Sequence, residues 1–254
     1  MLSLFSYRLK RLHRGVLARL SLLAPAMARF LRTPCPLMML EYAAQRKNRT
    51  LLILLPGIDD LAEDFERRGF VRELQRQRVA ADAVALDAHF GYYATRAIFE
   101  RITDDVIASA RAAGYREIWL VGISLGGFGA ASYAARHPGS VSGVTLLAPY
   151  LGGKSLIREI DEAGGLDRWE PGQVDDDDFP RRLWAWLKRN GGPAHSGPQV
   201  YLGYGKNDAF ARAHALLAAT LPPERVFSIA GRHDWRTWRQ IWRMFLVQWS
   251  RIHG

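Results

Sequence analysis

The stretch "LVGISLGGFGA" at residues 120–130 constrains the fold of this chain more than any other. An apolar run, typical of a buried strand, leads through a Gly-x-Ser-x-Gly-Gly turn into small residues typical of a tightly packed helix. One interpretation is packing: Gly122, Gly126 and Gly127 let a helix cross close over a strand, with Ser124 as its cap. The other is chemical, because a nucleophilic serine sits on a sharp, strained strand-to-helix turn where larger side chains would clash. The remainder of the chain has to distinguish the two.

Short apolar strands and amphipathic helices alternate along most of the sequence. This alternation predicts parallel βαβ units, and therefore an α/β fold with a mostly parallel central sheet flanked by helices. The length of 254 residues, 48% of them hydrophobic, suffices for one large core. A helix is expected over residues 59–77, with Asp59 and Asp60 as N-cap candidates. The expected strands lie within residues 36–42, 49–57, 79–88, 117–123, 141–150, 198–205 and 225–231.

The alternation stops at about residues 151–198, which we interpret as an insertion. It contains repeated Gly-Gly pairs, the acidic run 175–178, and the aromatic residues Trp169, Trp184 and Trp186. The segment is either a helical excursion on the surface or a lid that covers the mouth of a site and supplies apolar contacts to a substrate. The acidic run is interpreted as a solvated turn, because consecutive residues cannot all face one ion.

Residues 1–33 form a basic amphipathic arm that precedes the main domain, residues 34–254. Within residues 1–40 there are seven Lys or Arg and no Asp or Glu, so most of the net charge of +10 lies there. Leu9, Leu12, Val16 and Leu20 recur at helical spacing. Such a helix either docks on the body through its apolar stripe or contacts an anionic membrane surface. A cleaved signal is a third alternative, but Arg19 interrupts its apolar core, and the apolar run is too short to span a membrane.

The rest of the composition excludes several classes of function. Cys35 is the single cysteine, and no Cys/His cluster has zinc spacing, so we expect no metal and no cofactor. The nearly neutral body disfavours nucleic-acid binding. We expect a bacterial protein in the cytoplasm, with membrane association through the arm, rather than a secreted one.

Two candidate partners for a nucleophilic Ser124 follow later strands. Serine needs a general base, and the base needs a carboxylate that orients it. Asp208 follows the strand at 198–205 and His233 follows the strand at 225–231, and parallel strands bring such positions to one edge of the sheet. The order Ser, Asp, His is the one that accompanies a Gly-x-Ser-x-Gly elbow. His89 also follows a strand and is the alternative base, whereas Asp234 is expected to cap the last helix.

An attacked acyl carbonyl also requires donors for the oxyanion that forms. The backbone N–H of Leu125, directly after the serine, is one candidate. The turn after the early strand offers a second through Ile58, although its Pro-Gly pair is also a plain turn dipeptide. The residues expected to line a substrate pocket are Gly57, His89, Tyr92, Tyr93, Trp184, Trp186 and Trp235.

Over roughly residues 36–253 the chain resembles the α/β-hydrolase fold family. The resemblance is carried by the Ser124 elbow, the Pro-Gly turn after the early strand, the insertion, and Asp208 and His233 as acid and base. It implies a parallel sheet with a helical cap. Many members carry His-Gly at the oxyanion turn, where this chain has Pro56-Gly57, which puts the donor at Ile58 in question.

The sequence therefore predicts an acyl hydrolase in which Ser124 attacks a small-molecule ester or thioester and His233 transfers the proton. The aromatic insertion and the basic arm favour a medium or long acyl chain presented near a membrane. Amidase, peptidase, acyltransferase and cofactor-free perhydrolase activities use the same parts and remain open. A hydrolase-fold protein that binds at a membrane surface without catalysis is the alternative from another class.

Overall fold

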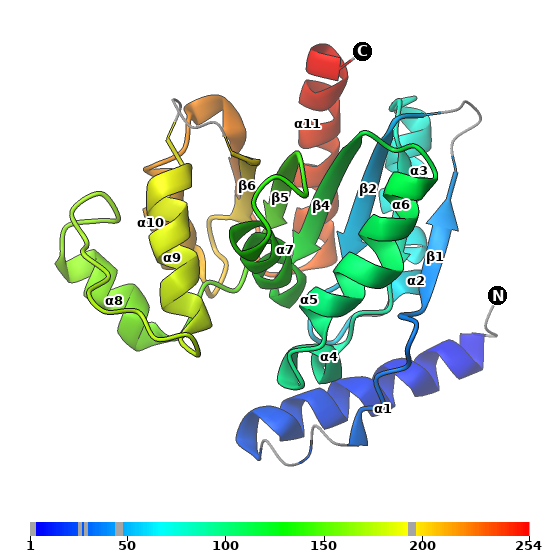
Figure 1. Ribbon diagram of the computed structural model, residues 1–254, viewed down its shortest axis with the longest axis horizontal. Helices are drawn as coiled ribbons and strands as arrows, with labels where there is room; N and C mark the ends of the chain where they lie inside the picture. Colours follow the sequence, from blue (N-terminus) through cyan, green and yellow to red (C-terminus); the bar gives the residue numbers. More distant parts are fainter. Residues whose placement is uncertain (1–3, 25–26, 28–29, 44–47, 193–196, 254) are drawn as a thin grey trace.

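Seven strands build the central sheet of the computed structural model, which describes residues 4–24, 27, 30–43, 48–192 and 197–253. Their order is β1-β3-β2-β4-β5-β6-β7, and all neighbouring strands are parallel except β1, which pairs antiparallel with β3 at one edge (Figure 1). The predicted mostly parallel sheet is confirmed. The strands are β1 (Met39–Tyr42), β2 (Thr50–Leu55), β3 (Asp82–Leu86), β4 (Glu117–Ile123), β5 (Gly143–Leu147), β6 (Gln199–Gly205) and β7 (Val226–Ile229).

Helices cover both faces of the sheet, and the central strands are buried on both sides. Successive side chains of β2 alternate between the two cores: Ile53 faces one, whereas Leu52 and Leu54 face the other. Against the Leu52 side pack α2 (Ala62–Arg67), α3 (Phe70–Arg76) and α11 (Trp235–His253). Against the Ile53 side pack α4 (Phe90–Ala94), α5 (Ile98–Arg101), the π-helix η2 (Ile102–Ile107), α6 (Ala108–Ala112), α7 (Leu125–Arg136), α8 (Lys154–Glu162), α9 (Phe179–Asn190) and α10 (Ala211–Ala218), and the short 3-10 helix η3 (Pro223–Arg225) precedes β7.

The helix expected over residues 59–77 differs from the prediction in two ways. It is divided into α2 and α3 at Gly69, whose φ of 87° is a left-handed conformation that glycine adopts readily. Asp59 and Asp60 do not cap it, so that prediction is wrong. The N-cap position is Leu61, and its backbone N–H donates to the Asp64 carboxylate at 2.9 Å.

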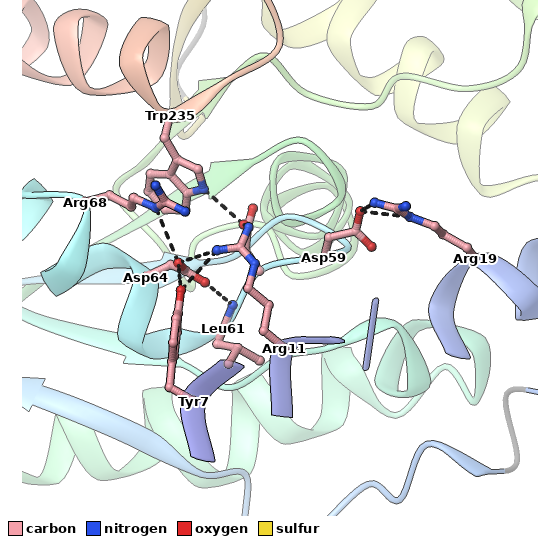
Figure 2. Close-up of polar contacts among 9 residues, drawn as sticks. Tyr7, Arg11, Arg19, Asp59, Leu61, Asp64, Arg68 and Trp235 are labelled. Atoms are coloured by element: carbon pink, nitrogen blue, oxygen red, sulfur yellow. Dashed lines mark hydrogen bonds and ion pairs between the residues drawn. The ribbon is translucent and has the colours of Figure 1, made fainter. Parts of the chain in front are cut away.

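An amphipathic helix, α1 (Leu4–Leu23), is present in the N-terminal arm and lies along the carboxyl edge of the sheet (Figure 1). It docks through its polar face, so the alternative of docking through the apolar stripe is wrong. Arg11 binds Asp64 at 2.7 Å and Asp60 at 2.9 Å, and the Tyr7 hydroxyl donates to Asp64 (Figure 2). The loops after β2 and β3 present buried carboxylates at this edge, and buried carboxylates need cationic partners.

The insertion between β5 and β6 is helical, and its tryptophans belong to the core. Trp169 and Trp184 are buried, and the indole N–H of Trp184 donates to the carbonyl of Leu151 at 2.7 Å. Asp178 in the acidic run caps α9 by accepting the backbone N–H of Arg181. The described part of the insertion is thus a helical excursion packed beside α7, residues 193–196 lie outside the described chain, and a lid remains a prediction.

None of the described helices combines the length and the hydropathy that crossing a bilayer requires. Among the described residues, no group of three or more His, Cys, Asp or Glu is arranged so that it could hold a metal ion.

The glycines of the elbow predict a steep cost for added side chains. A Cβ on Gly126 would overlap the carbonyl groups of Leu55 and Pro56, which are backbone atoms that cannot rotate away. We expect Gly126→Ala to lower the free energy of unfolding by at least about 2 kcal/mol, as overpacking of a close contact does. Urea unfolding measures this, with Gly153→Ala as the control because a Cβ there meets open space. Equal stability of the two variants would contradict the close crossing.

Candidate active site

Ser124 occupies the turn between β4 and α7 with a strained backbone. Its φ of 51° and ψ of −112° are unusual for a residue with a side chain, and such a conformation persists only when neighbours impose it. The backbone N–H of Ser124 donates to Leu147 at 3.0 Å, and its carbonyl accepts from Tyr150 at 2.9 Å, so the end of β5 holds the turn. The glycines agree with the packing interpretation of this turn, and the strained backbone of Ser124 agrees with the chemical interpretation.

The loops after β6 and β7 are bound to each other, and each carries one predicted partner of Ser124. The backbone N–H of Asn207 donates to the carbonyl of Gly231 at 2.9 Å, and the two loops approach so closely that Gly205 has no room for a Cβ. Asp208 lies on the first loop and His233 on the second. The structure therefore brings residues 208 and 233 to the same edge of the sheet as residue 124.

The three side chains form one hydrogen-bonded chain. His233 Nε2 lies 3.0 Å from Ser124 Oγ, and His233 Nδ1 lies 2.7 Å from Asp208 Oδ2. Burial raises the pKa of Asp208, but hydrogen bonds from His233 and from the Phe210 backbone N–H outweigh it and hold that pKa below its usual value. An ionised Asp208 accepts a hydrogen bond from Nδ1–H of His233, which leaves Nε2 free to accept a hydrogen bond from the serine hydroxyl. Asp234 does not compete, because it accepts the backbone N–H of Thr237 and caps α11 as expected.

Aromatic rings lie around the hydrogen-bonded side chains of Ser124, His233 and Asp208, and the sequence analysis did not identify these rings. Phe210 and Trp238 meet the His233 ring edge to face, with centroid distances of 5.3 and 5.0 Å. Phe210 also contacts Tyr150, which in turn contacts Phe128. Phe128, Tyr150 and Phe210 are half-buried. Their positions in the sequence could have indicated them, since Phe210 comes two residues after Asp208 and Phe128 comes four residues after Ser124.

The turn after β2 lies directly against the serine. A Cβ on Gly57 would lie 3.7 Å from Ser124 Cβ, so the turn that contains Gly57 and Ile58 packs against Ser124 at Gly57. Leu125 is the first residue of α7, and the N–H groups of a first helical turn have no partner within the helix. Both predicted oxyanion donors, the backbone N–H groups of Ile58 and Leu125, thus belong to segments that meet at the serine.

Asp60, in the turn after β2, binds residues of both the first helix, α1, and the last helix, α11. The sequence analysis did not predict this role. Asp60 Oδ1 accepts from Arg11 at 2.9 Å and from the Trp235 indole at 3.0 Å. Its backbone N–H donates to the carbonyl of Gly57 and closes the turn. Burial raises the pKa of Asp60 to about 6. The first and last helices therefore meet at a carboxylate that supports the turn containing Ile58.

His89, the alternative base, has both ring nitrogens engaged by backbone groups. Nδ1 accepts from Gly91 N–H at 3.1 Å and caps α4, whereas Nε2 donates to the carbonyl of Arg32 at 2.9 Å. Burial, together with the charge of Arg14, lowers the pKa of His89 to about 4. These contacts make His89 a neutral structural residue.

The other predicted pocket residues also have partners away from Ser124. Tyr92 donates its hydroxyl to the carbonyl of Pro34, and the Tyr93 ring packs against Gly129 on α7. Trp184 is in the core, as described above, and Trp186 lines a groove of about 270 Å³ between α7 and α9 that does not include Ser124. Trp235 reaches the site indirectly, through Asp60. Gly57 is the predicted pocket residue that lies against the serine.

Comparison with known proteins places this geometry in context. A family model described as the α/β hydrolase fold matches residues 50–183, more than half of the chain. A search of curated protein sequences gives no significant match.

Solved structures share the fold at low sequence identity. An S-formylglutathione hydrolase from Staphylococcus aureus is 14% identical with a TM-score of 0.55, covering 84% of this chain and 95% of its own. A fluorophosphonate-binding serine hydrolase from the same species is 13% identical with a TM-score of 0.56, covering 84% and 97%. A monoacylglycerol lipase from Paleococcus ferrophilus is 14% identical with a TM-score of 0.55, covering 84% and 99%.

A buried histidine behind the site predicts how stability depends on pH. His214 on α10 donates from Nε2 to the carbonyl of Pro149 at 2.9 Å, and burial lowers its pKa to about 4. Between pH 7 and pH 5 the unfolded chain takes up a proton there that the folded chain does not, so stability falls as the pH falls. We expect His214→Gln, whose amide still donates but does not titrate, to reduce that loss by about 2 kcal/mol.

Urea unfolding at pH 7 and pH 5 checks this expectation. His137→Gln is the control, because that histidine lies at the far end of α7 and is more exposed than His214. Partial burial and the charge of Arg136 lower the pKa of His137. An unchanged pH dependence in His214→Gln would contradict a neutral buried imidazole.

Proposed function

The chain belongs to the α/β hydrolase fold family, and we propose that it is a serine hydrolase that cleaves an ester or thioester bond through an acyl-enzyme intermediate. The observation that carries the proposal is the hydrogen-bonded chain from Ser124 Oγ through His233 to Asp208. A serine hydroxyl is hardly nucleophilic at neutral pH, and this arrangement is the one that activates it.

In the proposed acylation step, Ser124 Oγ attacks the carbonyl carbon of the substrate while its proton passes to His233 Nε2. The carbonyl oxygen becomes an oxyanion, which the backbone N–H groups of Leu125 and Ile58 stabilise. The tetrahedral intermediate collapses, the bond to the leaving group breaks, and the proton on Nε2 passes to the departing alkoxide or thiolate. Asp208 remains ionised and stabilises the imidazolium that forms between these events.

In the proposed deacylation step, water takes the place of the alcohol or thiol. His233 Nε2 accepts a proton from the water as its oxygen attacks the acyl carbonyl. Collapse of the second tetrahedral intermediate breaks the bond to Ser124 Oγ, which recovers the proton from Nε2. The products are a carboxylic acid and the free enzyme, and these steps require protein groups and water.

The acyl group that we propose is apolar. The half-buried residues Phe128, Tyr150 and Phe210 form a run of ring contacts that reaches His233, and aromatic surfaces favour apolar groups over charged ones. We call these three residues, Phe128, Tyr150 and Phe210, the aromatic wall. The insertion begins directly after Tyr150, so we propose that its helices α8 and α9 form a cap beside the aromatic wall. Amides, peptides and acceptors other than water could use the same residues, and the choice between them is a matter for substrate screening.

Loss of either proton-transfer partner should abolish most of the activity. With p-nitrophenyl butyrate as substrate, we expect Ser124→Ala and His233→Ala each to lower kcat/KM by about six orders of magnitude, and Asp208→Asn by about four. Ser132→Ala is the control, because this buried serine lies in α7, the helix that follows Ser124. Its hydroxyl has no hydrogen-bond partner among the described residues. Activity of Ser124→Ala close to that of the unchanged protein would refute the proposed nucleophile.

The aromatic wall predicts selectivity for the acyl chain. We expect Phe128→Ala to lower kcat/KM for p-nitrophenyl octanoate at least about fivefold more than for the acetate, because the shorter chain buries less apolar surface against the ring. Phe179→Ala on α9 is the matched control, since its ring contacts Phe99 rather than the rings beside Ser124. Equal losses for the two esters would show that Phe128 does not bind the acyl chain.

A further inference from the structure

The face of α1 that points away from the protein is apolar. Leu9, Leu12, Val16, Leu20 and Leu23 are between 41% and 86% exposed. At 100° per residue these five positions fall within an arc of about 80°. Isolated exposed leucines are common, but a continuous stripe of them marks an interaction site.

Ion pairs on the opposite face keep this stripe outward. Arg11 pairs with Asp64 and Asp60, and Arg14 pairs with Asp87, three carboxylates that are each at least 93% buried by side chain. Rolling α1 to bury its leucines would separate these pairs and leave carboxylates buried without partners, which is strongly destabilising. Gly15 adds a close approach, because a Cβ there would lie 3.3 Å from Asp59 Oδ1. The apolar stripe is therefore a fixed feature of the folded surface.

We propose that this face of α1 docks the protein on an anionic lipid membrane. The helix contains no acidic residue, and Arg8 and His13 are exposed on either side of the stripe. Arg19 borders it as well and keeps most of its side chain in solvent while it pairs with Asp59. Leucines that enter the acyl boundary, with cations at the depth of the lipid headgroups, are the arrangement of an interfacial helix. The net charge of +10 attracts the protein to the same surface.

A second copy of the chain fits this face less well than a lipid surface does. From Leu9 to Leu23 the stripe is about 21 Å long, and a width of about 10 Å gives about 210 Å². Two such stripes bury about 420 Å² in total, about a third of the lower limit for a stable protein interface. The edges of the stripe are also cationic on both copies, so antiparallel pairing would bring like charges together. A membrane requires neither a matching shape nor a matching partner.

The position of α1 relative to the candidate active site gives this docking a consequence. α1 lies at the carboxyl edge of the sheet, bound to the loops after β2 and β3, and Ser124, Asp208 and His233 lie at the same edge. Arg11 also contacts the Asp60 that supports the Gly57–Ile58 turn. Docking through the stripe thus brings the site to the lipid surface, where acyl esters with apolar chains are held. This consequence for the substrate rests on the proposed function, whereas the docking itself does not.

Flotation with vesicles tests the proposal. The full chain is mixed with vesicles of phosphatidylcholine, with and without phosphatidylglycerol, and the bound fraction is measured. We expect it to float with the anionic vesicles, and we expect the combined change Leu12→Ser, Val16→Ser and Leu20→Ser to lower the vesicle affinity at least about tenfold. The matched control combines Met244→Ser, Val247→Ser and Ile252→Ser, which removes three exposed apolar side chains from α11, and it should bind like the unchanged protein.

The contradicting outcomes are distinct from a failure of the proposed chemistry. All six positions are exposed, so each variant should keep the hydrolysis rate for a soluble short-chain ester. Ser124→Ala should still float, whatever the fate of the enzymatic proposal. The proposal is overturned if the unchanged protein stays unbound, or if the α1 variant binds as well as the α11 control. A concentration-dependent dimer in light scattering, lost in the α1 variant, would assign the face to a second copy instead.

Discussion

The close crossing of α7 over the ends of β2 and β4 is the constraint on which the rest of the site depends. Gly122 and Gly126 allow backbone to meet backbone there, and Ser124 at the apex is forced into a left-handed conformation. The strain of this turn is balanced by hydrogen bonds to the end of β5 and by the tight packing of the turn after β2. The same crossing therefore holds Ser124 where the turn after β2 and the first turn of α7 meet.

A second constraint is the set of buried carboxylates at the carboxyl edge. Asp60, Asp64 and Asp87 are each buried, and each is paired with a cation from α1. Because the basic face of α1 pairs with these carboxylates, the leucines on its opposite face point away from the protein. The electrostatics of the edge thus explain both the docking of α1 and the apolar surface that it presents. They also connect α1 to Asp60, and through it to the turn that contains Ile58.

Much of the fold and the geometry at the serine could be predicted from the sequence, because both depend on local patterns in a fixed topology. Strand and helix periodicity predicts a parallel sheet, and in a parallel sheet Ser124, Asp208 and His233 necessarily end at one edge. The mode of docking of α1 could not be predicted in this way. Periodicity reveals an amphipathic helix but not which face is buried, since the carboxylates that decide it come from the loop after β2, from α2 and from the loop after β3.

Several residues that the sequence suggests for a pocket have their contacts away from Ser124, for a related reason. Tryptophans at helical spacing look the same whether they line a site or fill a core, and Trp184 fills the core. His89 follows a strand as His233 does, but the carbonyl of Arg32 that engages it lies far away in sequence. The rings that do border the site, such as Phe210, are ordinary in their sequence context and gain their meaning from the approach of His233.

Covalent labelling with a fluorophosphonate, followed by mass spectrometry of the modified peptide, shows directly whether the serine of the elbow is an activated nucleophile. We expect one phosphonyl group per chain, on Ser124 Oγ, with labelling that is lost in His233→Ala because the serine then lacks its base. Labelling at another residue, or labelling of Ser124 at the same rate without His233, would contradict an activated nucleophile at the elbow.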